Sequence, residues 1–379
     1  MIYVIILVKK CKEVLILKFT CDKAELSKIL KNISVAAAQK TTTIPAMQGV
    51  LMELNQNKLK LSCYDLKIGM SSEIDVTSSE EGEVVVSADV FCNIAQKIKG
   101  EKLTFASDER NIVSISSGRS KFKIVGMNSE EFPYLPDFDV KKSFSGNGKE
   151  IRAALKNALI ATLEDGSAKA TSGINCEVKE NLLTLSSING VIGVQRTVDV
   201  TGDDMAFIIP GKECRAILKL LDVDDTVSFS LGERHLLIKV GQYTIVTRLL
   251  EGNFPALAPL MKFKFCSELV VDRKELKSSL ECISLVNIQR IAKPVKISIS
   301  KDGIGLYISS SLGESNEFCS VESFSGEELT VGLSPTYLLN VIDSLTSDMV
   351  TLFFGPERSP VIVDSEKDKE KVLIAPMVI

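Results

Sequence analysis

The sequence lacks the residue patterns that most enzymes and metalloproteins carry. It contains a single histidine, His235, and its nine cysteines never form a Cys-x-x-Cys pair. It has no Gly-x-x-x-x-Gly-Lys phosphate loop and no spaced carboxylate signature for a metal. We therefore predict no catalytic residue, no metal and no cofactor. A hydrolase that uses a Cys–His pair at His235 remains a distant alternative, and it would lose its reaction on His235→Ala.

Composition narrows the class further. The chain has 379 residues, of which 45% are hydrophobic and 25% charged, so it can bury two or three ordinary domain cores. Its scattered cysteines resemble small core residues of a reducing cytoplasm rather than a disulfide framework. A formal net charge of −4 argues against a uniformly basic nucleic-acid binder, although it does not show how the charges are distributed.

The N-terminal segment differs from the rest of the chain. The run from Met1 to Val8 is apolar and is followed by Lys9 and Lys10. It is too short to span a bilayer, and its charges follow the apolar run instead of preceding it as in a signal peptide. We interpret residues 1–16 as an extension outside the repeats that adds only a strand or a tail. Translation that starts at Leu17 is the alternative.

The remaining chain repeats one order of elements three times. Similar turn sequences occur at 64–69, 188–193 and 311–314, each after an alternating strand pattern, and Phe132-Pro133 returns as Phe254-Pro255. A repeat of this length is a duplicated domain rather than a solenoid unit. We predict domains at 17–141, 142–264 and 265–379.

Each predicted domain contains two helices and several short strands. The first helices cover 22–33, 149–162 and 272–286, with Asp22 and Asp272 as N-caps, and the second helices begin near Ala88, Pro210 and Pro335. Period-two alternation predicts strands at 59–63, 183–186 and 304–308, with hairpin turns at 110–111, 232–233 and within 364–371. These patterns indicate an α+β fold with antiparallel sheets. Tandem copies can pair their sheet edges, but two outer edges stay open unless two chains close head to tail into a ring.

Basic residues concentrate on these helices although the chain is acidic overall. In the second copy they follow the spacing i, i+3, i+7, which places them on one side of a helix, away from the apolar stripe. Solubilising charge on exposed helices is the simpler interpretation, but recurrence in all three copies favours a surface that contacts phosphates without reading bases. The predicted DNA-binding residues are Lys23, Lys28, Lys31, Lys149, Arg152, Lys156, Lys212, Arg215, Lys219, Lys274 and Lys277.

The chain resembles the β subunit of bacterial DNA polymerase III, the sliding DNA clamp. The resemblance extends from Leu17 to Ile379 and rests on short segments in a fixed order, at 17–20, 43–47, 117–122, 131–133, 250–255 and 375–377. It implies three clamp domains per chain, each with two helices packed on antiparallel sheets, and a head-to-tail homodimer that forms a six-domain ring around duplex DNA. It further implies no catalysis, a bacterial cytoplasmic location at the nucleoid, and tethering of DNA polymerase, repair factors and a clamp loader. No membrane role is implied.

Two sites follow from the resemblance. The ring-closing contact would join Phe122 and Ile124 of one chain to Leu285 and Val286 of the next, with ordinary core packing as the alternative. The partner site would be an apolar cleft between the second and third domains that accepts a short linear peptide. Its residues would be Thr171, Asn189, Gly190, Val191, Pro255, Leu260, Leu373, Ile374, Ala375, Pro376 and Met377.

The predicted cleft departs from the family pattern. Relatives often have Asp-Gly-His-Arg where this chain has 188–191, arginines after Phe-Pro-Asp-Tyr where it has 254–259, and Met-Pro-Met-Arg where it has 375–378. A cleft without these cations has fewer hydrogen-bond donors, so we expect altered or weaker peptide specificity and a divergent or secondary clamp. The competing hypothesis is a repeat-built scaffold that never encircles DNA and remains a monomer or an open assembly.

Overall fold

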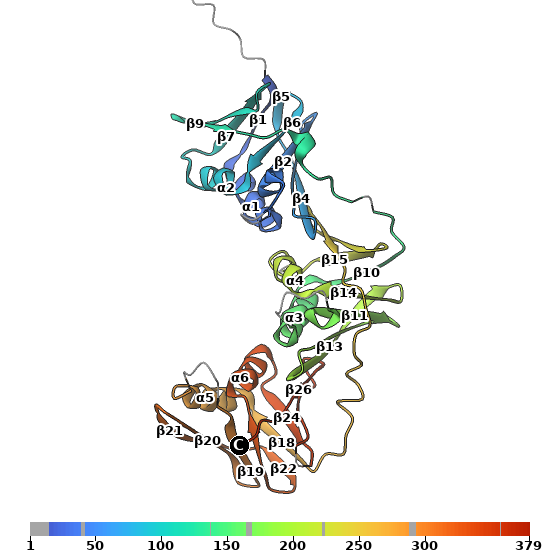
Figure 1. Cartoon of the computed structure of the whole chain (residues 1–379), viewed down its shortest axis with the longest axis vertical. Coiled ribbons are helices and arrows are strands. Elements are labelled where there is room, and N and C mark those ends of the chain that lie inside the picture. The colour runs from blue at the N-terminus through green and yellow to red at the C-terminus, as the bar shows by residue number, and fades with distance from the viewer. Residues whose placement is uncertain are drawn as a thin grey trace, which may run out of the picture. The chain divides into compact units, whose positions relative to one another are not determined.

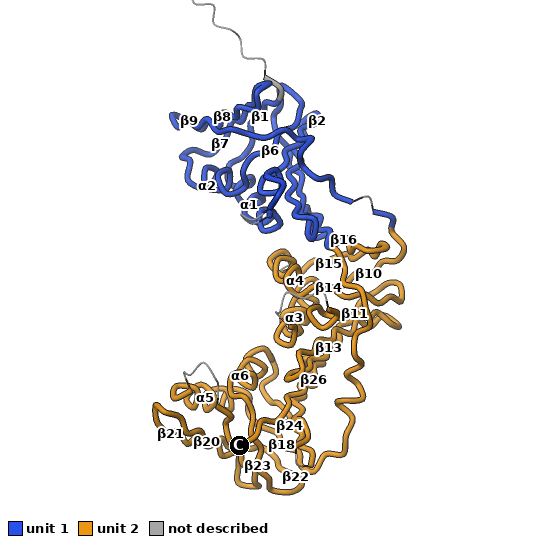
Figure 2. The backbone as a smooth tube through the Cα atoms, viewed as in Figure 1, with its two compact units in different colours: residues 1–139, 237–247 blue, residues 140–236, 248–379 orange. Residues whose placement is uncertain are grey.

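A computed structural model describes residues 15–38, 42–136, 138–163, 169–221, 224–287, 293–356 and 358–379. The chain forms two compact units, one of residues 1–139 with 237–247 and one of residues 140–236 with 248–379 (Figure 2). Most of the predicted extension, residues 1–14, lies outside the described residues. The first strand begins at Leu15, slightly before the start predicted at Leu17.

The first copy places two helices against antiparallel sheets (Figure 1). One sheet has the order β5-β1-β7-β8-β9, and in the other β2 pairs with β3 and β6 while β3 pairs with β4. The elements are β1 (Leu15–Asp22), α1 (Lys23–Ile33), β2 (Gly49–Asn55), β3 (Lys58–Tyr64), β4 (Ile68–Asp75), β5 (Thr77–Glu80), β6 (Gly82–Ser87), α2 (Ala88–Lys97), β7 (Lys102–Asp108), β8 (Ile112–Ser117) and β9 (Ser120–Val125).

The second copy repeats this order. Strand β10 pairs with β13 and β15, and β11 pairs with β12 and β14. Most of β17 belongs to the first compact unit, where it pairs with β4. The elements are β10 (Lys142–Asn147), α3 (Gly148–Ala158), β11 (Gly173–Lys179), β12 (Leu182–Ile188), β13 (Ile192–Gly202), β14 (Met205–Pro210), α4 (Gly211–Ile217), β15 (Thr226–Leu231), β16 (His235–Val240) and β17 (Tyr243–Arg248).

The third copy again follows a strand with a helix and inserts a second helix before its last three strands. One of its sheets has the order β21-β20-β19-β23. The elements are β18 (Ser267–Asp272), α5 (Arg273–Ser284), β19 (Val295–Ser300), β20 (Gly303–Ser310), β21 (Gly313–Cys319), β22 (Ser323–Gly326), β23 (Leu329–Leu333), α6 (Pro335–Ser344), β24 (Met349–Phe354), β25 (Val361–Ser365) and β26 (Glu370–Ile374). The predicted α+β class is confirmed, whereas the exact domain boundaries stay predictions.

The first helix of each copy begins in the same way. The side chain of Asp22 accepts a hydrogen bond from the Glu25 amide at 2.9 Å, and that of Asp272 from Glu275 at 2.8 Å. These contacts confirm both predicted N-caps, since such side chains satisfy amides that the helix leaves unpaired. The second copy uses Asn147 in the same role, at 3.1 Å from the Glu150 amide. The α3 helix therefore begins at Gly148, one residue before the predicted start.

The second helices begin where the sequence predicts but differ in length. Helices α2 and α6 start at Ala88 and Pro335 and each has 10 residues. Helix α4 has only 7 residues and ends at Ile217. Lys219 therefore lies beyond the helix, and the prediction that it continues a helical i, i+3, i+7 face was wrong. A period-3.6 pattern does not show where a helix stops.

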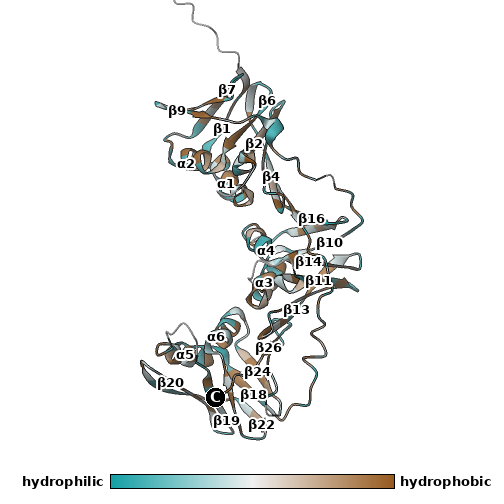
Figure 3. Ribbon diagram, viewed as in Figure 1, coloured by the Kyte–Doolittle hydropathy of each residue, from teal (hydrophilic) through white to brown (hydrophobic). Residues whose placement is uncertain are grey.

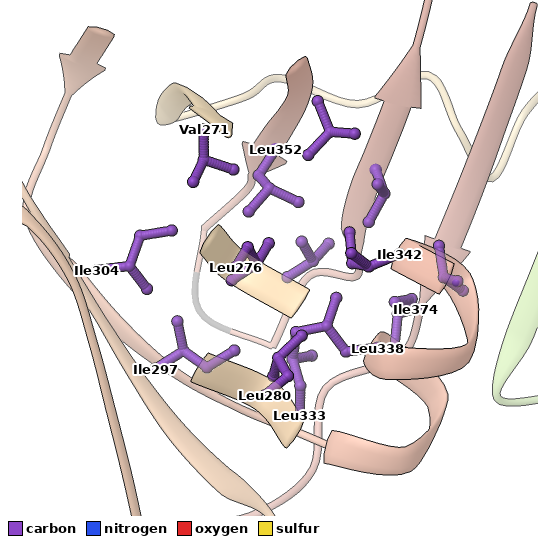
Figure 4. Close-up of a cluster of buried hydrophobic side chains, with 14 of the residues drawn as sticks. Val271, Leu276, Leu280, Ile297, Ile304, Leu333, Leu338, Ile342, Leu352 and Ile374 are labelled. Atoms are coloured by element: carbon purple, nitrogen blue, oxygen red, sulfur yellow. The ribbon is translucent and has the colours of Figure 1, made fainter. Parts of the chain in front are cut away.

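The helices bury one stripe against their sheets and expose the other side. Figure 3 shows brown and teal residues alternating along the helices, as expected for amphipathic segments. The core of the third copy combines residues of α5, α6 and several strands, and Figure 4 shows Leu276, Leu280, Leu338 and Ile342 converging there. Stacked aromatic rings support the other copies, with Phe19 5.1 Å from Phe105 and Phe144 4.6 Å from Phe229.

One ladder joins the second and third copies. Strand β13 pairs antiparallel with β26, from Ile192 opposite Ile374 to Arg196 opposite Glu370. Ile192, Val194, Val372 and Ile374 on one face of this ladder belong to the core of the third copy. Because neighbouring residues of a strand point to opposite faces, Gly193 and Leu373 face the other way. The two copies therefore share a continuous sheet and a hydrophobic core.

Replacing Leu280 by Ala should lower the free energy of unfolding by about 2–5 kcal/mol, because the truncation leaves a cavity in a fully buried core. Val140 is the control, since its side chain is 54% exposed and lies outside the described helices and strands. Val140→Ala should change stability by less than about 0.5 kcal/mol. Urea unfolding followed by circular dichroism measures both, and equal effects would contradict the described core.

Candidate nucleic-acid interface and partner cleft

A basic side chain in the first or second turn of each first helix binds a backbone carbonyl at or just after the end of the second helix. Lys23 Nζ donates to the Ile98 carbonyl, and Arg152 Nε donates to the Leu218 carbonyl at 3.0 Å. Arg273 Nε donates to the Ser347 carbonyl at 2.7 Å. These carbonyls lie where helices leave acceptors unsatisfied, so the cations cap one helix from another. We call these three residues the helix clamps.

The helix clamps revise the sequence interpretation. Lys23 and Arg152 were predicted to bind DNA, and the structure gives each a structural contact within its own copy. Arg273 was missed, because the sequence pattern drew attention to Lys274 and Lys277 beside it. A basic first residue of a helix, where the dipole disfavours a cation, was the signal that could have identified Lys23 and Arg273. Arg152 is the fifth residue of α3 and carried no such signal.

Other predicted DNA-binding residues lie beside carboxylates. Lys149 Nζ is 2.6 Å from Asp224, Lys274 Nζ is 3.8 Å from Asp348, and Lys277 contacts Asp343. Exposed pairs of this kind contribute little to stability, because water screens the two charges. Six further predicted residues have exposed side chains: Lys28, Lys31, Lys156, Lys212, Arg215 and Lys219.

The described part of the chain offers no cluster of side chains for a metal ion. It holds no group of three or more His, Cys, Asp or Glu side chains that could bind a metal ion. His235 lies on β16, where partial burial lowers its pKa, assisted by the positive charges of Arg248 and Arg234. Within the same described ranges, no helix is long and apolar enough to cross a membrane.

The predicted cleft residues gather at one end of the β13–β26 ladder. The Asn189 carboxamide accepts hydrogen bonds from the amides of Val191 at 3.0 Å and Ile192 at 2.9 Å, which shapes the turn before β13. The Ala375 amide donates to the Val191 carbonyl at 2.8 Å. The Met377 amide donates to Gly332 at 2.8 Å, so the C-terminal tail is held at two points. The turn and the tail are therefore neighbours, as predicted.

The floor of this region contains residues that the sequence interpretation missed. Leu257 and Met261 occupy one helical turn after Pro255, and both side chains are buried in a cluster with Ile362 and Leu373. The rings of Phe263 and Phe353 pack on this cluster, and each lies 4.7 Å from the ring of Phe265. A spacing of four residues in a Pro-rich loop was the available signal, because it matches one turn of a helix.

The assignment of Ile374 to the cleft was wrong. Its side chain is fully buried in the core of the third copy, whereas Leu373 belongs to the cluster under the cleft. Alternation along β26 sends these neighbours to opposite faces. Leu260 is 47% exposed, so it lies on the outer side of the turn that buries Leu257 and Met261. Thr171 lies in a short 3-10 helix (Ala170–Ser172) that approaches Gly252 at Ala170.

The predicted dimer residues lie at the two open sheet edges. Phe122 and Ile124 belong to β9, the last strand of its sheet, and Phe122 is 40% exposed. Leu285 follows α5, which packs on the edge strand β21, and Val286 packs against the core of the third copy. Exposure at Phe122 and Leu285 rules out the alternative of ordinary core packing for these two side chains. Three exposed apolar residues at these edges were missed: Val125, Leu312 and Phe318.

Family models match almost the whole described chain. They are the N-terminal domain of the DNA polymerase III beta subunit at residues 17–136, the central domain at 147–256 and the C-terminal domain at 263–378. The chain belongs to the DNA polymerase III beta subunit family. Membership confirms the resemblance, the three tandem clamp domains and the prediction of a sliding clamp that is an accessory factor rather than an enzyme.

Individual relatives of this clamp are distant in sequence and close in fold. The beta sliding clamp of Chlamydia muridarum is 22% identical over 365 residues, which cover 95% of this chain and 99% of the relative. The beta sliding clamp of Bacillus subtilis strain 168 is 23% identical over 377 residues, which cover 95% of this chain and 99% of the relative. The crystal structure of the Bacillus subtilis DNA polymerase sliding clamp has a TM-score of 0.91 at 22% identity, covering 96% of this chain and 99% of that one.

A further structural neighbour is the DnaN sliding clamp of Pseudomonas aeruginosa bound to griselimycin, with a TM-score of 0.90 at 20% identity. The matched region covers 96% of this chain and 100% of the Pseudomonas aeruginosa chain. At these identities the structural likeness establishes the fold alone, and the roles of individual residues must be argued from this chain.

The helix clamps predict different effects for two basic residues of α3. Arg152→Ala should lower the free energy of unfolding by about 1–2 kcal/mol, because the half-buried Leu218 carbonyl loses its charged donor. Lys156→Ala, at an exposed position of the same helix, should stay within about 0.5 kcal/mol of the parent. Urea unfolding again measures both. Equal stability of the two variants would show that Arg152 does not act as a helix clamp.

Proposed function

We propose that this sliding clamp closes with a second copy of itself, head to tail, into a ring that encircles duplex DNA without reading its sequence. The ring tethers DNA polymerase and other replication or repair factors in the bacterial cytoplasm, at the nucleoid. The observation that carries the proposal is the pair of open sheet edges, one basic and one acidic. Each edge also exposes apolar side chains that a soluble monomer has no reason to leave uncovered.

The first edge, β9, is basic. Lys121 and Lys123 are exposed along the strand, and Arg119 is exposed in the turn before it. Phe122 and Val125 add exposed apolar area, with Val125 76% exposed. An edge strand presents unpaired backbone groups on one side, and such groups favour pairing with another strand. We therefore assign β9 as one face of the ring-closing contact, with Ile124 beside Phe122.

The second edge, β21, is complementary. Glu314 is exposed and Glu317 is half-buried on this strand. Leu312 is 61% exposed, Phe318 60% and Leu285 72%, and the half-buried Val286 lies next to Leu285. Opposite charges steer two copies together and fix the orientation, while the apolar side chains supply affinity. Because the two edges differ, the contact is heterologous, and such contacts form closed rings when the rotation permits.

DNA contact is assigned to the exposed basic residues of the helices. Lys28, Lys31, Lys156, Lys212, Arg215 and Lys219 carry most of it, and Lys149, Lys274 and Lys277 join by exchanging their carboxylate partners for phosphates. Contacts to phosphate alone hold a duplex without fixing its position, which suits sliding. Lys23 and Arg152 act first as helix clamps and take only a secondary part.

Partner peptides are assigned to the region between the Asn189 turn, the Leu257–Met261 turn and the C-terminal tail. A short peptide can place an apolar anchor on the cluster of Leu257, Met261 and Leu373, with backbone groups of the tail fixing its orientation. The turn before β13 carries Val191 at a position where the family often has an arginine, and we therefore propose altered peptide specificity relative to other clamps. A relative from C. crescentus, with a TM-score of 0.89 at 18% identity, has PEG bound at its putative beta-motif tethering region.

Retention on circular DNA tests the ring. The clamp, loaded by a bacterial clamp loader onto a nicked circular plasmid, should stay bound through gel filtration and be lost after the plasmid is linearised. A scaffold that never encircles DNA would show no difference between the two forms.

Lys156→Ala combined with Lys212→Ala should weaken direct DNA affinity and flatten its dependence on salt, because fewer counterions are released.

The complementary edges predict a charge-reversal rescue. Lys121→Glu with Lys123→Glu, or Glu314→Lys with Glu317→Lys, should weaken dimerisation at least tenfold, because like charges would face each other. A mixture of the two variants should regain dimerisation, because the two reversed edges meet at one contact of the mixed ring and the two unaltered edges meet at the other. Analytical ultracentrifugation measures each case, with Tyr134→Ser as the control because Tyr134 is 73% exposed and belongs to neither edge strand. Unchanged dimers in both variants would overturn the assignment.

A further inference from the structure

The junction of the second and third copies contains a buried ionic group. Arg196 on β13 and Glu370 on β26 are directly opposite in the ladder, and Arg196 Nη1 lies 3.1 Å from Glu370 Oε2. The same oxygen accepts a hydrogen bond from Asn157 Nδ2 of α3 at 2.6 Å. The side chain of Glu370 is 0% exposed and that of Arg196 11%. We call these three residues the junction triad.

Solvation does not favour this arrangement. Burial raises the pKa of Glu370 even though Asn157 and Arg196 favour its carboxylate. Glu370 Oε1 and Arg196 Nε have no hydrogen-bond partner among the residues that the structure describes. A buried ion pair of this kind is often no more stabilising than well-packed apolar residues of similar volume. Its presence therefore calls for a role other than stability.

The position of the junction triad in the ladder indicates that role. Val194 and Arg196 lie on the same face of β13, and Val372 and Glu370 lie on the same face of β26. In the observed register the valines face each other in the core and the charges face each other at its end. A slip of two residues would oppose Glu370 with Val194 or Val198, or Arg196 with Val372, leaving a buried charge against a valine. A slip of one residue would turn every side chain to the wrong face.

The other face of the same ladder carries the cleft. Gly193 and Leu373 are opposite each other there, and a Cβ on Gly193 would lie 3.2 Å from Leu257. The register of the ladder therefore decides where Leu373 meets Leu257 and where the Asn189 turn meets the C-terminal tail. Asn157 extends the constraint to the helix layer, since its carboxamide also donates to the carbonyl of Ser344, the last residue of α6, at 3.4 Å.

We propose that Arg196, Glu370 and Asn157 are positioning residues for the partner cleft, which fix the register of β26 against β13 and so align the two halves of the peptide site. The proposal rests on the proposed peptide-binding function. It assigns to the junction triad a role in specificity that the cleft residues themselves do not perform, because none of the three belongs to the cluster under the cleft.

Replacing the ion pair by apolar residues separates positioning from stability. In the full-length clamp, Arg196→Met with Glu370→Leu should leave the melting temperature unchanged or higher. The affinity for a fluorescently labelled polymerase-type clamp-binding peptide should fall at least fivefold. Lys371→Met with Asp364→Asn is the matched control, because this partly exposed ion pair joins β26 to β25 rather than to β13. The control should bind the peptide as the parent does.

Cross-strand disulfide formation reads the register directly. Gln195→Cys with Lys371→Cys places two thiols at directly opposed positions, and Gln195→Cys with Lys369→Cys reports a slip of two residues. Peptide mapping by mass spectrometry identifies each bridge after mild oxidation. With Arg196 and Glu370 in place, only the bridge between positions 195 and 371 should form in high yield. With Arg196→Met and Glu370→Leu, the yield of that bridge should fall and the yield of the bridge between positions 195 and 369 should rise.

The possible results are distinct. Failure of the parent clamp to bind the peptide would overturn the proposed cleft and the positioning role with it. Parent-like binding and register in the apolar variant would overturn the positioning role alone. If the apolar variant does not fold, Glu370→Gln keeps the side-chain volume and removes the charge. It should lower peptide affinity at least twofold, and unchanged affinity would overturn the role.

Discussion

Every strand of an antiparallel sheet has two sides of backbone donors and acceptors, and the structure follows from where these groups find partners. Within each copy the strands pair with one another and the helices cover one face of the sheet. Between the second and third copies the partner of β13 is β26, so a hydrogen-bonded ladder holds two repeats together. At β9 and β21 each strand has a partner on one side only. The ring that we propose would close through these edges rather than through any pocket or reactive side chain.

The charges of the chain take three different roles that its composition conceals. One set caps helices, with carboxylates and Asn147 at the N-termini and the clamps Lys23, Arg152 and Arg273 at carbonyls of the second helices. A second set lies on exposed helix surfaces and sheet edges, where water screens it until a phosphate or a second copy arrives. The third set is the buried pair of Arg196 and Glu370. A net charge near zero is compatible with DNA binding because these sets are separated in space.

Much of the fold could be predicted because it depends on local patterns. The caps Asp22 and Asp272, the starts of α2 and α6, and the hairpin turn with Asn111 at a positive φ of 57° all follow from a few neighbouring residues. The candidate sites were harder, since they depend on which face of a strand or helix meets another element. Ile374 was assigned to the cleft because it lies beside Leu373 in sequence, and Arg196 and Glu370 drew no attention because only the ladder brings them together. The prediction that Lys219 lies on a helical face was wrong for a related reason, because α4 ends earlier than the spacing of its basic residues suggests.

The helix clamps and the exposed basic residues that we propose to contact DNA differ in residue type. In the second and third copies the cations that hold the helices together are the arginines Arg152 and Arg273, whereas the exposed helix residues are mostly lysines such as Lys28, Lys156 and Lys212. Acetylation neutralises a lysine and leaves an arginine charged. Acetylation of the lysines that we propose to contact DNA would therefore weaken that contact and leave the arginine clamps of these two copies unaltered.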